Sequence, residues 1–169
     1  AESLERFVNA GGTLILGPRS GVKDEHNAVV EDFLPGPLRG LAGCFVEDYD
    51  AFSAIPGFTM QVKDGNGREY EALGLAEILV PEANGRSILS YARRYYAGRS
   101  AAVEHPYGSG RCLYLGTVLG EEGLEAFLKR ILDETGISYQ ERLPPALEVA
   151  CRERDGQRYR FYLNHGTAQ

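Results

Sequence analysis

A loop near the start of the chain gathers several side chains that could bind or catalyse. It follows the apolar stretch TLIL (13–16) and covers residues 17–27. In α/β proteins, a segment that leaves the carboxyl end of a strand is a usual position for binding and catalytic groups. We therefore take this loop as the candidate site, and its charged and polar residues are Arg19, Lys23, Asp24, Glu25, His26 and Asn27.

Nucleophilic catalysis is not favoured by the spacing of residues in the loop. A nucleophile elbow reads GxSxG or GxCxG directly after a buried strand. Here Gly17-Pro18-Arg19-Ser20-Gly21 offers Ser20 at the wrong spacing. Cys112 opens a later strand without a nearby histidine, which is more typical of a core cysteine than of a nucleophile. His105 precedes Pro106 at the end of a strand, and we expect it at the surface.

Metal binding and acid–base chemistry are only weakly indicated. Asp24, Glu25 and His26 could bind a metal, but adjacent residues rarely converge on one ion and no second cluster completes the shell. The carboxylates of EDYD (47–50) point to alternate faces of an extended segment, so a solvated edge is favoured over a catalytic pair. The sequence therefore predicts no catalytic residue, no metal and no cofactor.

Composition limits the partners and the compartment. The formal net charge of -6 argues against nucleic acid, because phosphate binding needs clustered positive charge. ARRYY (92–96) is too short to form a basic patch, and we interpret it as a strand face with extended arginines. No apolar run approaches the ~20 residues of a membrane helix, so no membrane partner is expected. The three cysteines are far apart and form no CxxC pair, which favours a reducing compartment, the cytoplasm.

The elements around the loop are typical of an α/β domain. Leu4, Phe7 and Val8 lie on one face of a helix that runs into the apolar strand 13–16. Consecutive apolar residues in a short strand indicate a parallel sheet covered by helices on both sides. LYLGTV (113–118) is a second such strand, so we expect the two strands to lie side by side, both buried. A helix that feeds a buried strand is half of a βαβ unit, so we expect the chain to begin inside a truncated α/β domain.

The rest of the chain predicts one long helix, one short helix, one short strand and three tight turns. Leu124, Phe127 and Ile131 belong to an apolar stripe on a helix over 121–135, which we expect to pack on one face of the sheet. AEILV (76–80) reads as a short strand before Pro81, and PGPLRGLAG (35–43) as a short helix. The predicted turns are Asp64–Gly67, Tyr107–Gly110 and Asp155–Gly156.

A domain boundary is indicated at LPP (143–145), a stiff connector after which the apolar pattern changes to a period of two. We therefore expect residues 1–145 to form one domain. Residues 146–169 are expected to form the first hairpin of a second, antiparallel β domain, because a lone hairpin is marginally stable in water.

Several stretches carry a family resemblance in a consistent order. They are LERFVNAGGTLILGPRSGVKDEHNAVV (4–30), LPGPLRGLAGCFVEDYDAF (34–52), AAVEHPYGSGRCLYLGT (101–117) and RYRFYLNHG (158–166). Together they resemble the middle domain of family-42 glycoside hydrolases, which are bacterial β-galactosidases. The resemblance covers nearly the whole chain and is most specific over 11–27.

The resemblance implies a fold, partners and an activity. The fold would be flavodoxin-like, as in class I glutamine amidotransferases, and the domain would build a homotrimer. The parent enzyme would hydrolyse terminal β-D-galactosides with retention, using two glutamates on a separate catalytic (β/α)8 barrel, so no catalytic residue carries over to this chain. In amidotransferases of related topology the first strand leads to the catalytic cysteine, and Gly17-Pro18-Arg19 stands in that place here. Loop 17–27 would contact another subunit or form the rim of the sugar site in the barrel. The alternative is a surface loop whose charges only form salt bridges with one another.

Two other classes of protein stay open on the residues alone. A stand-alone enzyme of amidotransferase type would need a cysteine or serine elbow, which the loop lacks. A carbohydrate-binding module usually exposes aromatic residues on a flat face, and ten tyrosines with no tryptophan leave that alternative weak.

Overall fold

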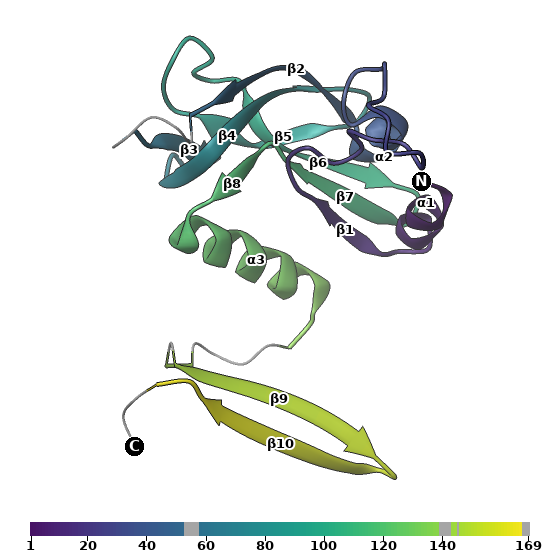
Figure 1. The fold of residues 1–169 in the computed structure, drawn as a ribbon, viewed down its shortest axis with the longest axis vertical. Coiled ribbons are helices and arrows are strands. Elements are labelled where there is room, and N and C mark those ends of the chain that lie inside the picture. Colours follow the sequence, from purple (N-terminus) through teal and green to yellow (C-terminus); the bar gives the residue numbers. More distant parts are fainter. Residues whose placement is uncertain (53–57, 139–142, 145, 167–169) are drawn as a thin grey trace. The chain divides into compact units, whose positions relative to one another are not determined.

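The computed structural model describes residues 1–52, 58–138, 143–144 and 146–166 (Figure 1). The chain divides into two compact units, Ala1–Phe127 and Leu128–Gln169. The candidate loop lies wholly in the first unit.

The described part of the first unit is built on an eight-stranded mixed sheet. The strand order is β1-β7-β6-β5-β3-β4-β2, and β8 pairs with β4 outside this path. Figure 1 shows β1, in purple, beside the green β7, although about a hundred residues separate them in the sequence. The strands are β1 (Thr13–Leu16), β2 (Cys44–Ala51), β3 (Met60–Asp64), β4 (Glu69–Pro81), β5 (Arg86–Tyr91), β6 (Ser100–Tyr107), β7 (Gly110–Leu115) and β8 (Thr117–Leu119).

The predicted pairing of the two apolar strands is confirmed, but the predicted second strand 113–118 is wrong in its bounds, because it is divided between β7 and β8. β1 and β7 are parallel, with Thr13 opposite Arg111 and Leu16 opposite Tyr114. β7 is buried over its last four residues, as expected for a strand covered on both faces. The expected burial of β1 is wrong for most of its length, because Leu16 is buried but Ile15 is 38% exposed.

The predicted flavodoxin-like, amidotransferase-like parallel sheet is wrong. Among the described strands only β1 and β7 pair in parallel, and every other pairing in the sheet is antiparallel. The physical reason is the way the chain turns. A parallel pair needs a long crossover, usually a helix, whereas a tight turn returns the chain antiparallel. The turns at 64–67 and 107–110 join β3 to β4 and β6 to β7.

The helices are few and short in the described residues: α1 (Glu2–Asn9), a 3-10 turn η1 (Gly36–Leu38), α2 (Arg39–Ala42) and α3 (Glu121–Thr135). α1 buries Val8 and leaves Phe7 53% exposed. The predicted short helix before Gly43 is confirmed as η1 and α2, and Gly43 ends it with a left-handed φ of 63°. The predicted stripe of α3 is confirmed in part, because Phe127 is buried but Leu124 is 42% exposed.

A hydrophobic core lies where α1 and α2 meet the sheet. Cys112 is fully buried in it, so the prediction of a core cysteine is confirmed, and burial raises the pKa of its thiol to about 12. Cys44 is also fully buried. The buried members are Val8, Leu16, Leu38, Leu41, Ala42, Cys44, Val46, Leu79, Val103, Cys112 and Tyr114.

Three local predictions are wrong. His105 is buried rather than exposed, with Nδ1 3.0 Å from the Leu41 carbonyl oxygen, because β6 is an inner strand whose end meets α2. ARRYY is a turn between β5 and β6 rather than a strand face, and Arg94 in it has a φ of 73°. AEILV is the second half of β4, a single strand of 13 residues, and not a separate short strand.

The second unit contains a β-hairpin of β9 (Leu147–Arg154) and β10 (Gln157–Asn164). The predicted turn at Asp155–Gly156 is confirmed, and both residues have left-handed φ values of 52° and 75°. Such values are those of the two-residue turns that best match the twist of a hairpin. Leu147 and Asn164 form the last pair of the hairpin, at the end opposite the turn.

Candidate functional site

The outer part of loop 17–27 is a small hairpin that is held by its own hydrogen bonds. Lys23 and Val29 form an isolated antiparallel bridge. Asp24 Oδ1 accepts hydrogen bonds from the backbone N–H groups of His26 and Ala28, each at 2.9 Å. An aspartate that bonds the backbone two residues on is a common turn former. Segment 22–30 is therefore braced by hydrogen bonds between its own residues.

The six predicted site residues take three different roles. Lys23 Nζ donates to Asn27 Oδ1 at 2.7 Å, so these two residues and Asp24 brace the hairpin. The side chains of Glu25 and His26 lie at the tip, 84% and 82% exposed. Arg19 lies apart from the others at the base of the loop. The structure thus brings together Lys23, Asp24 and Asn27 for bracing, whereas Glu25 and His26 lie at the exposed tip, with Glu25 Oε1 3.9 Å from His26 Nε2.

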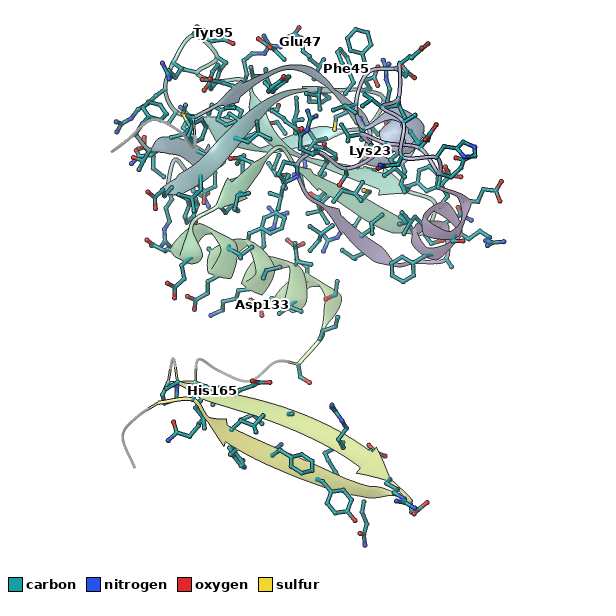
Figure 2. The ribbon with its side chains drawn as sticks, viewed as in Figure 1. Lys23, Phe45, Glu47, Tyr95, Asp133 and His165 are labelled. Carbon is teal, nitrogen blue, oxygen red and sulfur yellow. The ribbon has the colours of Figure 1, made fainter. Side chains whose placement is uncertain are left out.

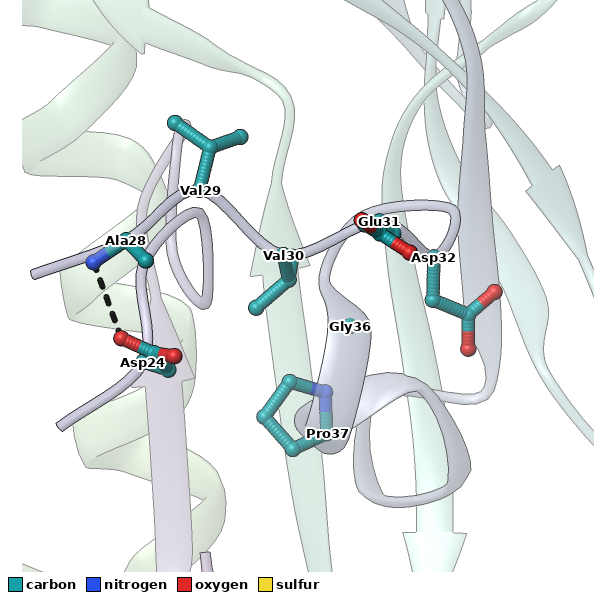
Figure 3. A pocket seen from close by; sticks show the side chains of 8 residues that line it. All are labelled: Asp24, Ala28, Val29, Val30, Glu31, Asp32, Gly36 and Pro37. Atoms are coloured by element: carbon teal, nitrogen blue, oxygen red, sulfur yellow. Dashed lines mark hydrogen bonds between the residues drawn. The ribbon is translucent and has the colours of Figure 1, made fainter. Parts of the chain in front are cut away.

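A shallow hollow of about 630 Å³ lies beside the hairpin (Figure 3). Three carboxylate side chains, Asp24, Glu31 and Asp32, and the 68% exposed Val29 are among its walls. Asp24 is already engaged by the backbone of the turn, as the dashed line in Figure 3 shows for Ala28. Nowhere in the described part of the chain do three or more His, Cys, Asp or Glu side chains gather in a group that could hold a metal ion.

The base of the loop is attached to the sheet through a residue that the sequence prediction missed. Arg19 has a φ of 66°, and its backbone N–H donates to Glu77 Oε1 at 3.0 Å. Its guanidinium carbon lies 5.4 Å from the centre of the Tyr49 ring on β2, a cation–π distance. Glu77 lies on β4 with no exposed surface, and its Oε2 accepts the hydroxyl of Tyr114 at 2.8 Å.

The electrostatics of Glu77 follow from its burial. Loss of water raises the pKa of its carboxyl group, and the hydrogen bonds from Tyr114 and Arg19 act in the opposite direction. Burial and the nearby Glu77 likewise raise the pKa of the Tyr114 hydroxyl far above its usual range. A sequence signal for Glu77 existed: it is the lone carboxylate inside the apolar run LGLAEILV (73–80). A charge in such a run is either on an exposed edge or buried with partners.

The raised pKa predicts how stability changes with pH. Because the folded chain holds the Glu77 proton more tightly than the unfolded chain, its contribution to stability is fully present below the ordinary carboxyl value of 4.5. That contribution is lost as pH rises through the raised pKa. Glu77→Gln cannot titrate, so the free energy of unfolding of the unmodified chain minus that of E77Q should fall as pH rises. Urea unfolding from about pH 4 to 8 measures it; a difference that stays constant would contradict the prediction.

The acidic strand β2 is a second cluster of charged residues. It ends the sheet, so the predicted edge position of EDYD is confirmed, and its register shifts between Val46 and Asp48. Glu47 pairs with Arg99, while Asp48 and Asp50 each accept a tyrosine hydroxyl at 2.9 Å, from Tyr95 and Tyr96. Figure 2 shows Tyr95, Glu47 and Phe45 along one edge. Each carboxylate has an arginine or tyrosine partner, an arrangement that braces the 92–99 turn.

Comparison with known proteins identifies the chain. A family model described as the β-galactosidase trimerisation domain matches residues 1–138. The chain belongs to the β-galactosidase trimerisation domain family. The resemblance to family-42 glycoside hydrolases is thereby confirmed, and an assembly role is supported over a stand-alone amidotransferase-like enzyme or a carbohydrate-binding module.

Relatives of this trimerisation domain are parts of longer proteins. β-Galactosidase BgaA of Clostridium cellulovorans is 34% identical over 164 residues, which are 97% of this chain and 24% of that protein. β-Galactosidase BglY of Alicyclobacillus acidocaldarius is 34% identical over 170 residues, 97% of this chain and 25% of that protein. The crystal structure of a β-galactosidase from Bacillus circulans sp. alkalophilus matches 97% of this chain and 25% of its own, with a TM-score of 0.89 and 27% identity. The chain thus spans about a quarter of the length of these relatives.

None of the helices in the described residues of the trimerisation domain combines the length and the apolar composition needed to cross a bilayer.

Proposed function

We propose that this trimerisation domain assembles a β-galactosidase into a ring of three subunits, and that the tip of loop 17–27 supplies one side of the contact. A threefold ring needs two different patches on each subunit, because its interface is heterologous. The observation that carries the proposal is the division of roles in the loop. Asp24, Lys23 and Asn27 hold its shape, while Glu25 and His26 point their side chains into solvent.

The parent protein would supply the chemistry. We propose that it hydrolyses terminal β-D-galactosides with retention on a catalytic barrel, and that this chain contributes no catalytic group. Support comes from the relatives, which are named β-galactosidases and are about four times as long. The polar rim of the barrel's sugar site is the second candidate position for loop 17–27, favoured by the open acidic hollow beside it.

We also propose the domain division at residue 145 and a cytoplasmic location. The family model ends at residue 138, and β9 and β10 pair only with each other among the described strands, which supports a separate β domain after the connector. Cys44 and Cys112 are free, buried thiols, and Cys151 is free and exposed, as suits a reducing compartment.

Reversing the charges at the tip should weaken the trimer of the full-length parent. Glu25→Lys with His26→Glu leaves the bracing residues unchanged, and like charges across the contact should raise the trimer dissociation constant about tenfold or more at low salt. The effect should shrink at high salt because exposed charges are screened. A reversal that includes Asp24 is less informative, since it would also remove the acceptor that shapes the turn. Sedimentation across a concentration series measures the constant.

The control is a reversed pair elsewhere, Glu153→Lys with Arg158→Glu, whose groups lie 3.6 Å apart and are more than half exposed. Activity on a nitrophenyl galactoside is measured at concentrations where every variant is trimeric. A trimer that stays intact with a raised KM would place the loop at the sugar site instead. An intact trimer with an unchanged KM would contradict both positions.

A further inference from the structure

Glu77 is a buried carboxylate to which the proposed function gives no task. Its exposure is 0%, the lowest of the charged side chains in the described residues. Taking a carboxylate out of water costs free energy unless hydrogen bonds replace the water. Both of its oxygens are used in this way, one by the Arg19 N–H and the other by the Tyr114 hydroxyl.

The sheet holds Glu77 in a fixed position. Its backbone N–H donates to the Gly116 carbonyl at 2.7 Å, and its own carbonyl accepts the Tyr91 hydroxyl at 2.9 Å. Tyr114 stands on β7, and Tyr91 stands on β5, so these contacts stay within the sheet. The bond to Arg19 differs, because it joins the sheet to the loop that leaves β1.

Arg19 needs such a contact because its backbone lies in the left-handed region, which residues with a β carbon avoid. The next fixed point follows two residues later. Gly21 has a φ of 71°, and a β carbon there would lie 2.1 Å from the Pro35 carbonyl oxygen. The path of the loop base is thus set at Arg19 by a hydrogen bond to the sheet and at Gly21 by close packing.

We propose that Glu77 is a positioning residue for loop 17–27: its carboxylate fixes the left-handed turn at Arg19 and so directs the hairpin 22–30 away from the sheet. The Arg19 side chain is directed at the same time, over the ring of Tyr49. That this orientation serves assembly rests on the proposed function, whereas the positioning itself does not.

The test uses the full-length parent with Glu77→Met combined with Tyr114→Phe. Methionine is close to glutamate in size, and the phenylalanine removes the hydroxyl that would otherwise lose its acceptor, so the sheet should still pack. The Arg19 N–H alone loses its partner. Two controls keep the Arg19 bond: Tyr114→Phe by itself, and Glu104→Gln, which changes another buried carboxylate that pairs with Arg86 and Arg111.

Hydrogen exchange followed by mass spectrometry gives the local readout. In the double variant, peptides covering 19–30 should exchange about tenfold faster or more, while peptides of β6 and β7 keep their rates. In both controls the loop peptides should change less than about threefold. The trimer dissociation constant is measured by sedimentation on the same samples.

The outcomes separate the two ideas. Faster loop exchange with a weaker trimer supports the positioning role and the assembly role together. Faster loop exchange with an unchanged trimer supports positioning and contradicts the assembly contact. Loop exchange that stays unchanged, or that rises equally in β6 and β7, would show Glu77 to be an ordinary core residue and would overturn the inference.

Discussion

Gly43→Ala should lower the free energy of unfolding by about 2–5 kcal/mol. Two costs add. Gly43 ends α2 in the left-handed conformation, which a β carbon disfavours by about 1–2 kcal/mol. The new β carbon would also lie 2.3 Å from Cγ of His105, and overpacking of this kind costs about 1–3 kcal/mol. The ring cannot move aside freely, because it is buried and its Nδ1 lies 3.0 Å from the Leu41 carbonyl oxygen.

Gly98→Ala is the matched control for this prediction. Gly98 also has a left-handed φ, of 84°, but nothing lies within 4 Å of its would-be β carbon. It should therefore lose only about 1–2 kcal/mol. Urea unfolding of both variants measures the difference, which reports the contact with His105. Equal losses would mean that the His105 ring moves aside and that it does not pack tightly against residue 43.

Phe127→Ala should cost about 3–5 kcal/mol, as large-to-small changes at buried positions do. Phe127 is 7% exposed, whereas Leu124, one turn earlier on α3, is 42% exposed. Leu124→Ala on the same helix should therefore cost less than about 1 kcal/mol. Thermal or urea unfolding compares the two variants. A cost below about 1 kcal/mol for Phe127→Ala would mean that its burial contributes little to the fold.

The local elements could be predicted from the sequence because their signals are local. The Asp64–Gly67 and Asp155–Gly156 turns carry aspartate and glycine at positions that tight turns require, and both form. The end of α2 at Gly43 follows the same logic. The parallel neighbours β1 and β7 were also found, since both show consecutive apolar residues.

The arrangement of the whole sheet could not be predicted in this way. A short apolar strand beside a helix is compatible with a parallel sheet and with the edge of a mixed one, and the family resemblance favoured the first. The turns 64–67 and 107–110 already required antiparallel neighbours. Strand order depends on contacts between distant residues, such as Cys44 opposite Pro81, which no local pattern encodes.

At the candidate site the sequence indicates which charged and polar residues are present, but it does not indicate most of their structural roles. In the sequence Asp24 is one of a group of charged residues, whereas in the structure its carboxylate accepts hydrogen bonds from two backbone N–H groups. Glu77 escaped notice because its partners are 58 and 37 residues away in the chain. A buried carboxylate is recognised by its surroundings, and those exist only after the sheet has formed.

The pairing of β1 with β7 has a consequence for how the chain is made. Ile15 lies opposite Leu113, so the hydrogen-bonded neighbour of the first strand among the described strands is synthesised about a hundred residues later. At about 5–20 residues per second, a nascent chain holds TLIL without that neighbour for roughly 5–20 s. Closing so long a segment is also slow in itself, because its entropy is lost before the contacts form. During translation β1 is therefore an apolar segment that lacks this neighbour, and the parallel pair can form only after β7 has been synthesised.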